Sequence, residues 1–148
     1  MGPRVTVTDR MSEVVARARD WIGTPYQHQA AAKDAGCDCL GLVRGIHREL
    51  SGRVVPMPPY TPNWPERLGR ETLLQAARDY LDEVPSTCTK PGDILAFRLR
   101  ADGPVTHVGI LSTPDLFIHA YGGRAVCESA FVRWWRRRHT HSFRFRED

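Results

Sequence analysis

The chain has 148 residues, enough for one domain with a single hydrophobic core, and we expect residues 1–148 to form one domain. Hydrophobic residues make up 41% and charged residues 26%, a balance that argues against disorder. No apolar stretch approaches a membrane span, so membrane insertion is not expected. The first fifteen residues lack the apolar core of a secretory signal, which predicts a protein made in the cytoplasm without a signal peptide.

A first helix is expected from Ser12 through Trp21. Ser12 can cap it, and apolar residues recur at helical spacing along one side. The segment 23–36 then reads as a connecting loop, because Gly23 and Pro25 interrupt the helical pattern.

A second helix is expected to begin near Asp38 and to end at Ser51 and Gly52. Its apolar face recurs at intervals of three and four: Cys39, Leu42, Val43, Ile46 and Leu50. Residues 54–66, "VVPMPPYTPNWPE", hold five prolines and should run as an extended surface segment. A third helix is expected over Glu71–Leu81.

From Pro91 onward the pattern changes to short apolar runs separated by turn residues. Four strands are expected, at residues 92–99, 105–111, 116–121 and 142–146. Helices that come first and strands that follow predict an α+β fold, with N-terminal helices packed on a mostly antiparallel sheet.

The net charge of +4 is concentrated near the end of the chain, where Arg133–Arg146 holds six arginines and no acid. One interpretation is a patch for nucleic acid or another polyanion. The other is a solvated strand-and-turn edge with arginines stacked on Trp134 and Trp135. We favour the second, and expect no nucleic-acid partner, because no nucleic-acid-binding motif is recognisable.

The sequence "GCDCLGLV" contains the strongest candidate for a reactive side chain. Cys39 falls in the first turn of the second helix, where free N–H groups and the helix dipole favour a thiolate and predict a lowered pKa. Asp38 can cap that helix, and Gly36 and Gly41 leave room for close approach. On its own, a free cysteine is more often buried filler than a nucleophile.

Two histidines stand inside apolar strands, where solvent exposure does not explain them. His107 and His119 flank a predicted hairpin, and a turn with an odd number of residues would put them directly opposite each other on one face. An even-length turn would put them on opposite faces. In the first case one imidazole can hold the other as a base for Cys39.

Metal binding and disulfide pairing are the other roles that the cysteines could have. Cys37, Cys39, His28 and His107 could supply zinc ligands, but paired structural cysteines are usually separated by two to four residues, and here only one intervenes. No metal is therefore expected. Cys88 and Cys127 are expected to be structural; they could pair if the protein leaves the cell.

Five segments together resemble a known family: "GTPYQHQ", "GCDCLGLVRG", "GDILAF", "THVGIL" and "FIHAY". They look like the NlpC-type peptidoglycan peptidases, a branch of the papain-like cysteine peptidases. The resemblance implies a papain-like fold, with Cys39 as nucleophile, His107 as base and His119 as the third polar residue, and no cofactor. The implied substrate is the peptide stem of peptidoglycan, often cut between D-glutamate and a diamino acid.

The same resemblance implies residues that bind substrate or the oxyanion. Tyr26 of the "TPY" motif should lie near Cys39, and Asp38 and Leu40 flank it. The family usually has a serine where this chain has Leu40, which predicts a more apolar subsite. It also lacks a cysteine at the position of Cys37.

Two further segments, "PPYTPNW" and "WWRRR…FRF", resemble the cell-wall peptidases encoded beside tail genes of phages and gene transfer agents. This implies a protein carried in a virion-like particle, docked to tail-tip or baseplate hub proteins and acting in the periplasm or cell wall. The Pro-rich segment and Trp134–Arg138 are the candidate docking surfaces. The alternative is a catalytically silent structural or adaptor component of a baseplate.

Overall fold

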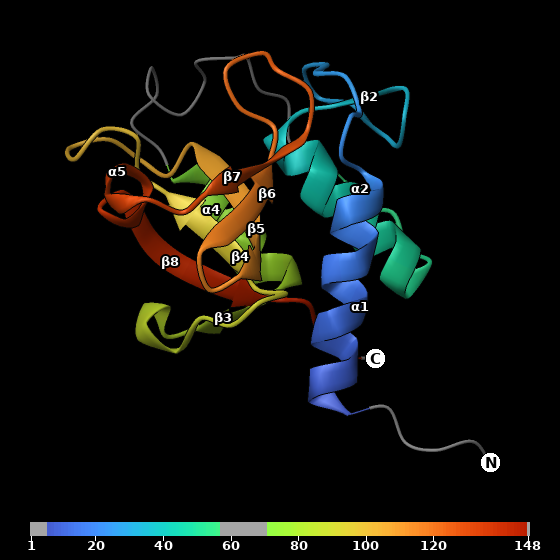
Figure 1. Cartoon of the computed structure of the whole chain (residues 1–148), viewed down its shortest axis with the longest axis horizontal. Helices are drawn as coiled ribbons and strands as arrows, with labels where there is room; N and C mark the ends of the chain where they lie inside the picture. Colours follow the sequence, from blue (N-terminus) through green and yellow to red (C-terminus); the bar gives the residue numbers. More distant parts are fainter. Residues whose placement is uncertain (1–5, 57–70, 148) are drawn as a thin grey trace.

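The computed structural model describes residues 6–56 and 71–147 and confirms an α+β fold (Figure 1). Its main sheet has the strand order β3-β8-β4-β5-β6-β7, and all neighbouring strands are antiparallel. The strands are β3 (Asp82–Val84), β4 (Ile94–Phe97), β5 (His107–Thr113), β6 (Leu116–His119), β7 (Cys127–Ala130) and β8 (His139–Arg144). Strands β1 (Ala31–Ala32) and β2 (Gly36–Cys37) form a separate pair.

The first helix, α1, spans Val7–Asp20 and begins five residues earlier than the sequence predicted. Thr6 is its N-cap, and the Thr6 side chain and Asp9 form a reciprocal capping box. Ser12 therefore lies inside the helix. The predicted apolar face is confirmed, because Val14 and Ala18 are buried.

Helix α2 spans Cys39–Ser51, with Asp38 as N-cap and Gly52 as a left-handed C-cap, as the sequence predicted. It packs closely on the residue that ends α1. A Cβ on Gly45 would overlap the indole ring of Trp21, so only glycine allows this approach. Helix α4 (Thr72–Tyr80) confirms the third predicted helix.

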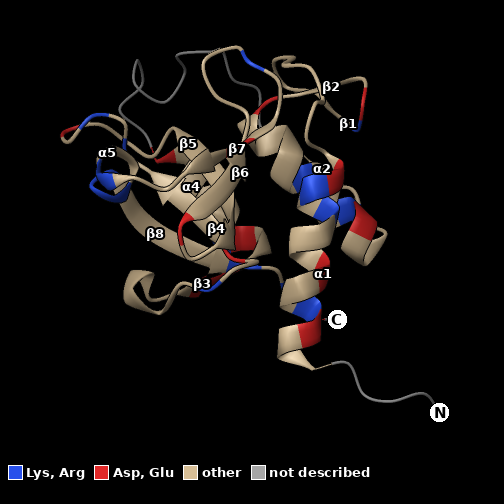
Figure 2. Cartoon of the chain, in the orientation of Figure 1, with Lys and Arg blue, Asp and Glu red and all other residues tan. Residues whose placement is uncertain are grey.

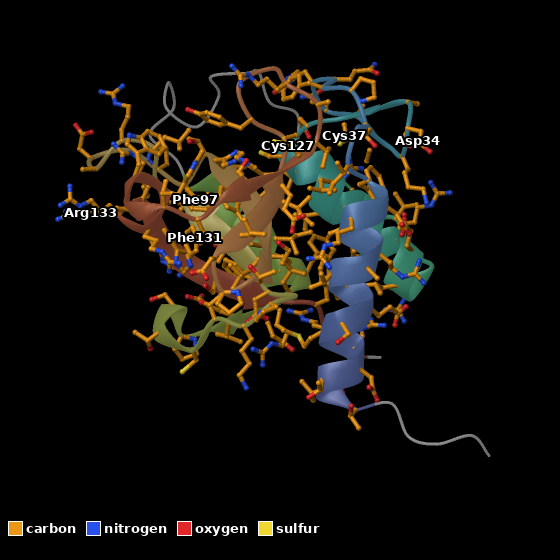
Figure 3. The ribbon with its side chains drawn as sticks, viewed as in Figure 1. Asp34, Cys37, Phe97, Cys127, Phe131 and Arg133 are labelled. Atoms are coloured by element: carbon orange, nitrogen blue, oxygen red, sulfur yellow. The ribbon has the colours of Figure 1, made fainter. Side chains whose placement is uncertain are left out.

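The sheet separates two cores. On one face lie α1, α2 and α4, and the alternation of β5 directs Val108 and Ile110 to this helical face. On the other face lies the aromatic cluster, which comprises Leu95, Phe97, Leu111, Phe117 and Phe131, with Leu99 and Trp135 packed against it. Phe97 and Phe131 are seen together on this side in Figure 3.

Arg133, Arg136 and Arg137 are exposed and Arg138 stacks on Trp134, so the arginine-rich end of the chain is in part solvated as the sequence predicted, but it is not a sheet edge. It begins with a short helix, α5 (Arg133–Arg136), and continues as β8, which lies between β3 and β4. Lys and Arg gather at α5 in Figure 2. Arg144 instead makes two hydrogen bonds, of 2.7 and 2.9 Å, to the buried carboxylate of Asp93. Arg144 of β8 thus has a structural role, because it pairs with a buried carboxylate.

Most of the predicted Pro-rich segment, from residue 57 onward, lies outside the described residues. In the described part of the chain, no helix combines the length and apolar character needed to cross a membrane.

Candidate active site

The start of α2 is held by its cap and by the preceding loop. Oδ1 of Asp38 accepts a hydrogen bond from the Gly41 N–H at 2.7 Å, and Oδ2 accepts one from the Gln29 N–H at 2.8 Å. The sequence prediction that Asp38 caps the helix is confirmed. Nδ1 of His28 lies 3.9 Å from Oδ2, which places this loop histidine beside the cap.

Gly41 allows the loop to lie directly on the first turn of α2. A Cβ at this position would overlap the backbone carbonyl oxygen of Ala30 and would lie 3.0 Å from Oδ1 of Asp38. Because the obstacle is backbone, a rotamer change cannot relieve it. The predicted close approach at Gly41 is therefore a contact between α2 and the backbone of the preceding loop at Ala30.

Cys39 is half-buried and lies against the beginning of β5. Burial raises the pKa of its thiol to about 12, and the Asp38 carboxylate adds to the increase. Hydrogen bonds from the backbone of Val108 and Leu40 act in the opposite direction but do not outweigh burial. The predicted lowering of the Cys39 pKa by the helix terminus is therefore wrong for the resting protein, whose thiol is neutral.

The two strand histidines are hydrogen-bonded to each other. Nε2 of His107 lies 2.9 Å from Nδ1 of His119, and the prediction that they share one face is confirmed. They are not directly opposite, however. Ile110 pairs with Ile118, so the ladder places His119 across from Gly109 and one diagonal step from His107.

A β-bulge at Ser112 creates this shared face. The turn between β5 and β6 has only two residues, because Thr113 pairs with Leu116. Such an even-length turn alone would put the histidines on opposite faces. The register shifts between Leu111 and Thr113, and this single extra residue restores the same face.

Sequence reasoning missed the residue that holds the second histidine. Nε2 of His119 lies 2.9 Å from Oγ of Ser129 on β7, and Sγ of Cys127 lies 3.4 Å from the same hydroxyl. The hydrogen-bonded chain therefore runs from His107 through His119 to Ser129. A polar residue on the next strand was the only signal available, and β7 itself, "CESA", has no apolar alternation.

Both imidazoles are deeply buried, with 3% of each residue exposed. Burial lowers the pKa of His107 well below 6.5, and neighbouring His119 adds to this decrease. Burial also lowers the pKa of His119 to about 4. Both rings are therefore neutral at neutral pH, the state in which His107 can accept a proton.

The two halves of the site meet where β5 begins. The backbone of Val108, which hydrogen-bonds Cys39, directly follows His107 in the chain. Within residues 6–56 and 71–147, no hydrogen bond joins the thiol to His107. Such bonds are often formed only when substrate is bound.

Tyr26 and Leu40 lie on two sides of the nucleophile. Tyr26 forms an isolated bridge with Cys37 and is 37% exposed. Burial raises the pKa of its hydroxyl, and Asp38, Cys39 and Cys37 add to this increase. The Tyr26 side chain therefore lies near Cys39, as the resemblance implied.

Leu40 lines a cavity of about 40 Å³ between α2 and α4. The cavity is almost entirely apolar, and Val43, Tyr80 and Val108 contribute to its wall. Leu40 thus faces apolar neighbours where α2 packs near α4, and the apolar subsite stays a prediction.

The four cysteines are free thiols. Cys37 is fully buried and Cys88 is exposed. Figure 3 shows Cys37 beside α2 and Cys127 on β7. Among the described residues, no group of three or more His, Cys, Asp or Glu side chains is arranged to hold a metal ion.

The sequence and the fold are both similar to those of known proteins. The NlpC/P60 family profile matches residues 23–144. The chain belongs to the NlpC/P60 family. It is 27% identical over 137 residues to "Probable endopeptidase NlpC" of Escherichia coli (strain K12), covering 89% of this chain and 79% of that protein. It is also 27% identical over 133 residues to "Gamma-DL-glutamyl hydrolase" of Bacillus subtilis (strain 168), covering 89% of this chain but only 29% of that protein.

Solved structures support the NlpC/P60 fold. The NlpC/p60 domain of the peptidoglycan hydrolase SagA superposes with a TM-score of 0.64 at 23% identity, covering 90% of this chain and 97% of that one. The peptidoglycan hydrolase RipB of Mycobacterium tuberculosis gives a TM-score of 0.62 at 21% identity, covering 99% and 70%. At these identities the likeness shows the fold.

Proposed function

We propose that this protein is a cysteine peptidase that hydrolyses the peptide stems of peptidoglycan, with Cys39 as nucleophile. The observation that carries the proposal is the 2.9 Å hydrogen bond between His107 and His119 at the start of β5, beside the backbone that faces Cys39. Membership of the NlpC/P60 family and the names of its relatives supply the substrate class.

The hydrogen-bonded chain assigns a direction to the protons. For Nδ1 of His107 to accept the thiol proton, its Nε2 must carry a proton and donate to Nδ1 of His119. Nε2–H of His119 then donates to Oγ of Ser129. This arrangement satisfies the His107–His119 and His119–Ser129 hydrogen bonds and leaves Nδ1 of His107 as an acceptor for the thiol proton.

The reaction then proceeds through an acyl-enzyme. Cys39 attacks the scissile carbonyl carbon as its proton moves to His107, and the carbonyl oxygen becomes an oxyanion. N–H groups of the first turn of α2 have no intrahelical partner and can stabilise it, together with the Tyr26 hydroxyl. His107 protonates the leaving amine, and water activated by the same ring then releases the acyl group.

The identity of Leu40 bears on specificity. Leu40 directly follows Cys39, at the position where the family resemblance implies a serine, so a hydroxyl that could bind a charged amine is replaced by an apolar side chain. We therefore expect a weakened requirement for a free N-terminal amine in the substrate.

Digestion of purified sacculi tests the proposal. Wild-type protein should release stem peptides with new termini that mass spectrometry identifies, and Cys39→Ala should release none. EDTA should leave the rate unchanged, whereas thiol alkylation should abolish it. Release of glycan ends in place of peptide ends, or a Cys39→Ala protein that still cleaves and is inhibited by chelation, would overturn the proposal.

We also propose a route to the cell wall: the protein is made in the cytoplasm and carried at the tip of a virion-like tail, docked to hub proteins. Two segments that resemble tail-associated peptidases support this, as do Val132 and Trp134, which are 53% and 45% exposed. Proteomics of purified particles should detect the protein. Its consistent absence from particles, with abundance in the host cytoplasm, would contradict the route.

A silent adaptor in a baseplate is the alternative to an enzyme in the same particle. The two are separated by one variant, since Cys39→Ala abolishes wall penetration by an enzyme and leaves an adaptor unaffected. The linked histidines and Ser129 favour the enzyme, because a scaffold has no need for a buried, aligned imidazole pair.

A further inference from the structure

The short helix α5 places Trp135 against both histidines. The centroid of its indole lies 5.5 Å from the His107 ring, with the planes inclined at 35°. The same indole lies 5.1 Å from the His119 ring and almost perpendicular to it, at 88°. A single side chain therefore contacts both members of the hydrogen-bonded pair.

The other rings around the pair include two from the sheet and Tyr121, which follows β6 and lies 5.2 Å from the His107 ring and 6.0 Å from the His119 ring. Phe117 lies 4.1 Å from the His119 ring, and Phe97 lies 5.7 Å from the His107 ring. Both stand on strands that carry or adjoin the histidines. Trp135 differs because it is supplied by the segment between β7 and β8, which crosses over this face.

Arginines secure the helix that carries this tryptophan. The guanidinium of Arg138 lies 3.7 Å above the Trp134 ring, and its Nη1 donates to the Trp134 carbonyl at 2.8 Å. The guanidinium of Arg136 lies 4.4 Å above Phe131, and its Nη2 donates to the Pro114 carbonyl at 3.0 Å. The basic run thus contributes to fixing α5 in place, and the arginine stacking that the sequence predicted is confirmed for Trp134.

We propose that Trp135 is a positioning residue for the His107–His119 pair: its indole closes the aromatic side of the pair against water and fixes the relative orientation of the two rings. The inference rests on the proposed peptidase function. It extends the candidate site to the C-terminal arm of the chain, which contributes no residue to the hydrogen-bonded chain itself.

The expected consequence is electrostatic. Burial is the largest cause that lowers the pKa of each imidazole, so a gap in place of the indole would admit water and raise both pKa values towards 6.5. Among residues 6–56 and 71–147, titratable groups beside the pair or its aromatic neighbours include Tyr121 after β6, Cys127 of β7 and, across Phe97, His139 of β8. Only His139 among these can gain a positive charge, and burial lowers its pKa as well.

Trp135→Ala and Trp135→Phe test this role, with Arg133→Ala as a matched control on the same helix. Arg133 is exposed and lies outside the aromatic cluster. In an NMR titration of the imidazole nitrogens, the His119 pKa should rise by on the order of one unit in Trp135→Ala. It should rise less in Trp135→Phe and stay unchanged in Arg133→Ala.

Kinetics give a second measurement. The acid limb of kcat/KM on stem peptide should move to higher pH in Trp135→Ala, and kcat at pH 7 should fall on the order of tenfold with KM little changed. Trp135→Phe should recover part of this loss. Circular dichroism establishes that each variant is folded; if Trp135→Ala is not, Trp135→Phe alone decides the question.

A folded Trp135 variant with unchanged imidazole titration and an unchanged pH profile would overturn the inference. The titration needs no turnover. A wild-type protein that fails to cleave stem peptides would therefore refute the proposed function, while the NMR titration would still decide whether Trp135 shields the pair.

Discussion

The two halves of the candidate site are built in different ways. On the helical face, Cys39, its cap and the close-packing glycine lie within four residues of one another. On the aromatic face, the histidine pair depends on β5, β6, β7 and α5, four consecutive elements that pack side by side. The candidate nucleophile is therefore placed within one helix turn, and the imidazoles are placed by pairing between several strands.

Burial affects the two halves in opposite directions, with one shared result. It raises the pKa of Cys39 to about 12 and lowers the pKa of His107 well below 6.5, so both groups are neutral in the resting protein. In the proposed mechanism, charge separates only when the thiol proton moves to the imidazole during attack, so the alignment of the two halves is decisive.

The first prediction tests whether the halves act as one unit. Cys39→Ala and His107→Ala should each reduce turnover of stem peptide by on the order of 10⁴-fold or more. The double variant should be scarcely slower than either, because each substitution already removes the coupled proton transfer. Cys88→Ala, at an exposed position, is the matched control and should retain the wild-type rate. Losses that multiply in the double variant would show that the halves contribute separately.

The helical half could be predicted from sequence because its signals are adjacent. Asp38, the apolar face of α2 and the ending at Gly52 all follow from propensity, capping and spacing over a few residues. Where local signals compete, the same reasoning failed. Ser12 is a plausible cap, but Thr6 has Asp9 three residues later to complete the capping box, and α1 begins there.

The second prediction concerns a substitution that disturbs only the helical half of the site. Gly41→Ala would drive a Cβ into the Ala30 carbonyl and crowd the cap, so the loop must move. We expect a loss of about 1–3 kcal/mol in the free energy of unfolding and a marked fall in activity. Gly103→Ala is the control, since its Cβ would meet Arg100 only at 3.4 Å. Urea unfolding measures both, and equal stability of the two variants would contradict the close approach.

The third prediction concerns only the aromatic half. In the unfolded chain His119 binds a proton below pH 6.5, whereas in the folded protein it does so only near pH 4. Its contribution to stability is therefore complete above pH 6.5 and is lost as pH falls towards 4, by about 1.4 kcal/mol per pH unit. Urea unfolding between pH 7 and pH 4.5 should show this slope. His107, whose pKa burial also lowers, adds a second contribution of the same sign. His119→Gln should therefore reduce the slope by about 1.4 kcal/mol per pH unit without abolishing it, and an identical slope in that variant would assign the acid sensitivity elsewhere.

The aromatic half could be predicted only in outline. The apolar context of His107 and His119 indicated that they meet, but their register depends on the bulge at Ser112, which no local signal marks. Ser129 and Trp135 reach the pair from β7 and α5, two elements that the sequence did not reveal. Their roles arise from strand order and chain crossing, which are properties of the whole fold.

The smallest predicted effect lies at the far end of the hydrogen-bonded chain. Ser129→Ala removes the acceptor of His119 Nε2 and leaves a buried N–H without its 2.9 Å partner. The ring is still held by His107 and by Phe117, so we expect only about a threefold to tenfold loss in kcat, an unchanged KM and a loss of about 1 kcal/mol in stability. Ser129→Thr keeps the hydroxyl and should restore most of the rate, whereas Ser86→Ala, at an exposed position, should change nothing. Steady-state kinetics and urea unfolding measure both effects. A Ser129→Ala protein with the wild-type kcat would show that the hydrogen bond to Ser129 does not orient the imidazole pair. Packing against Trp135 and the phenylalanine rings would then be what orients it.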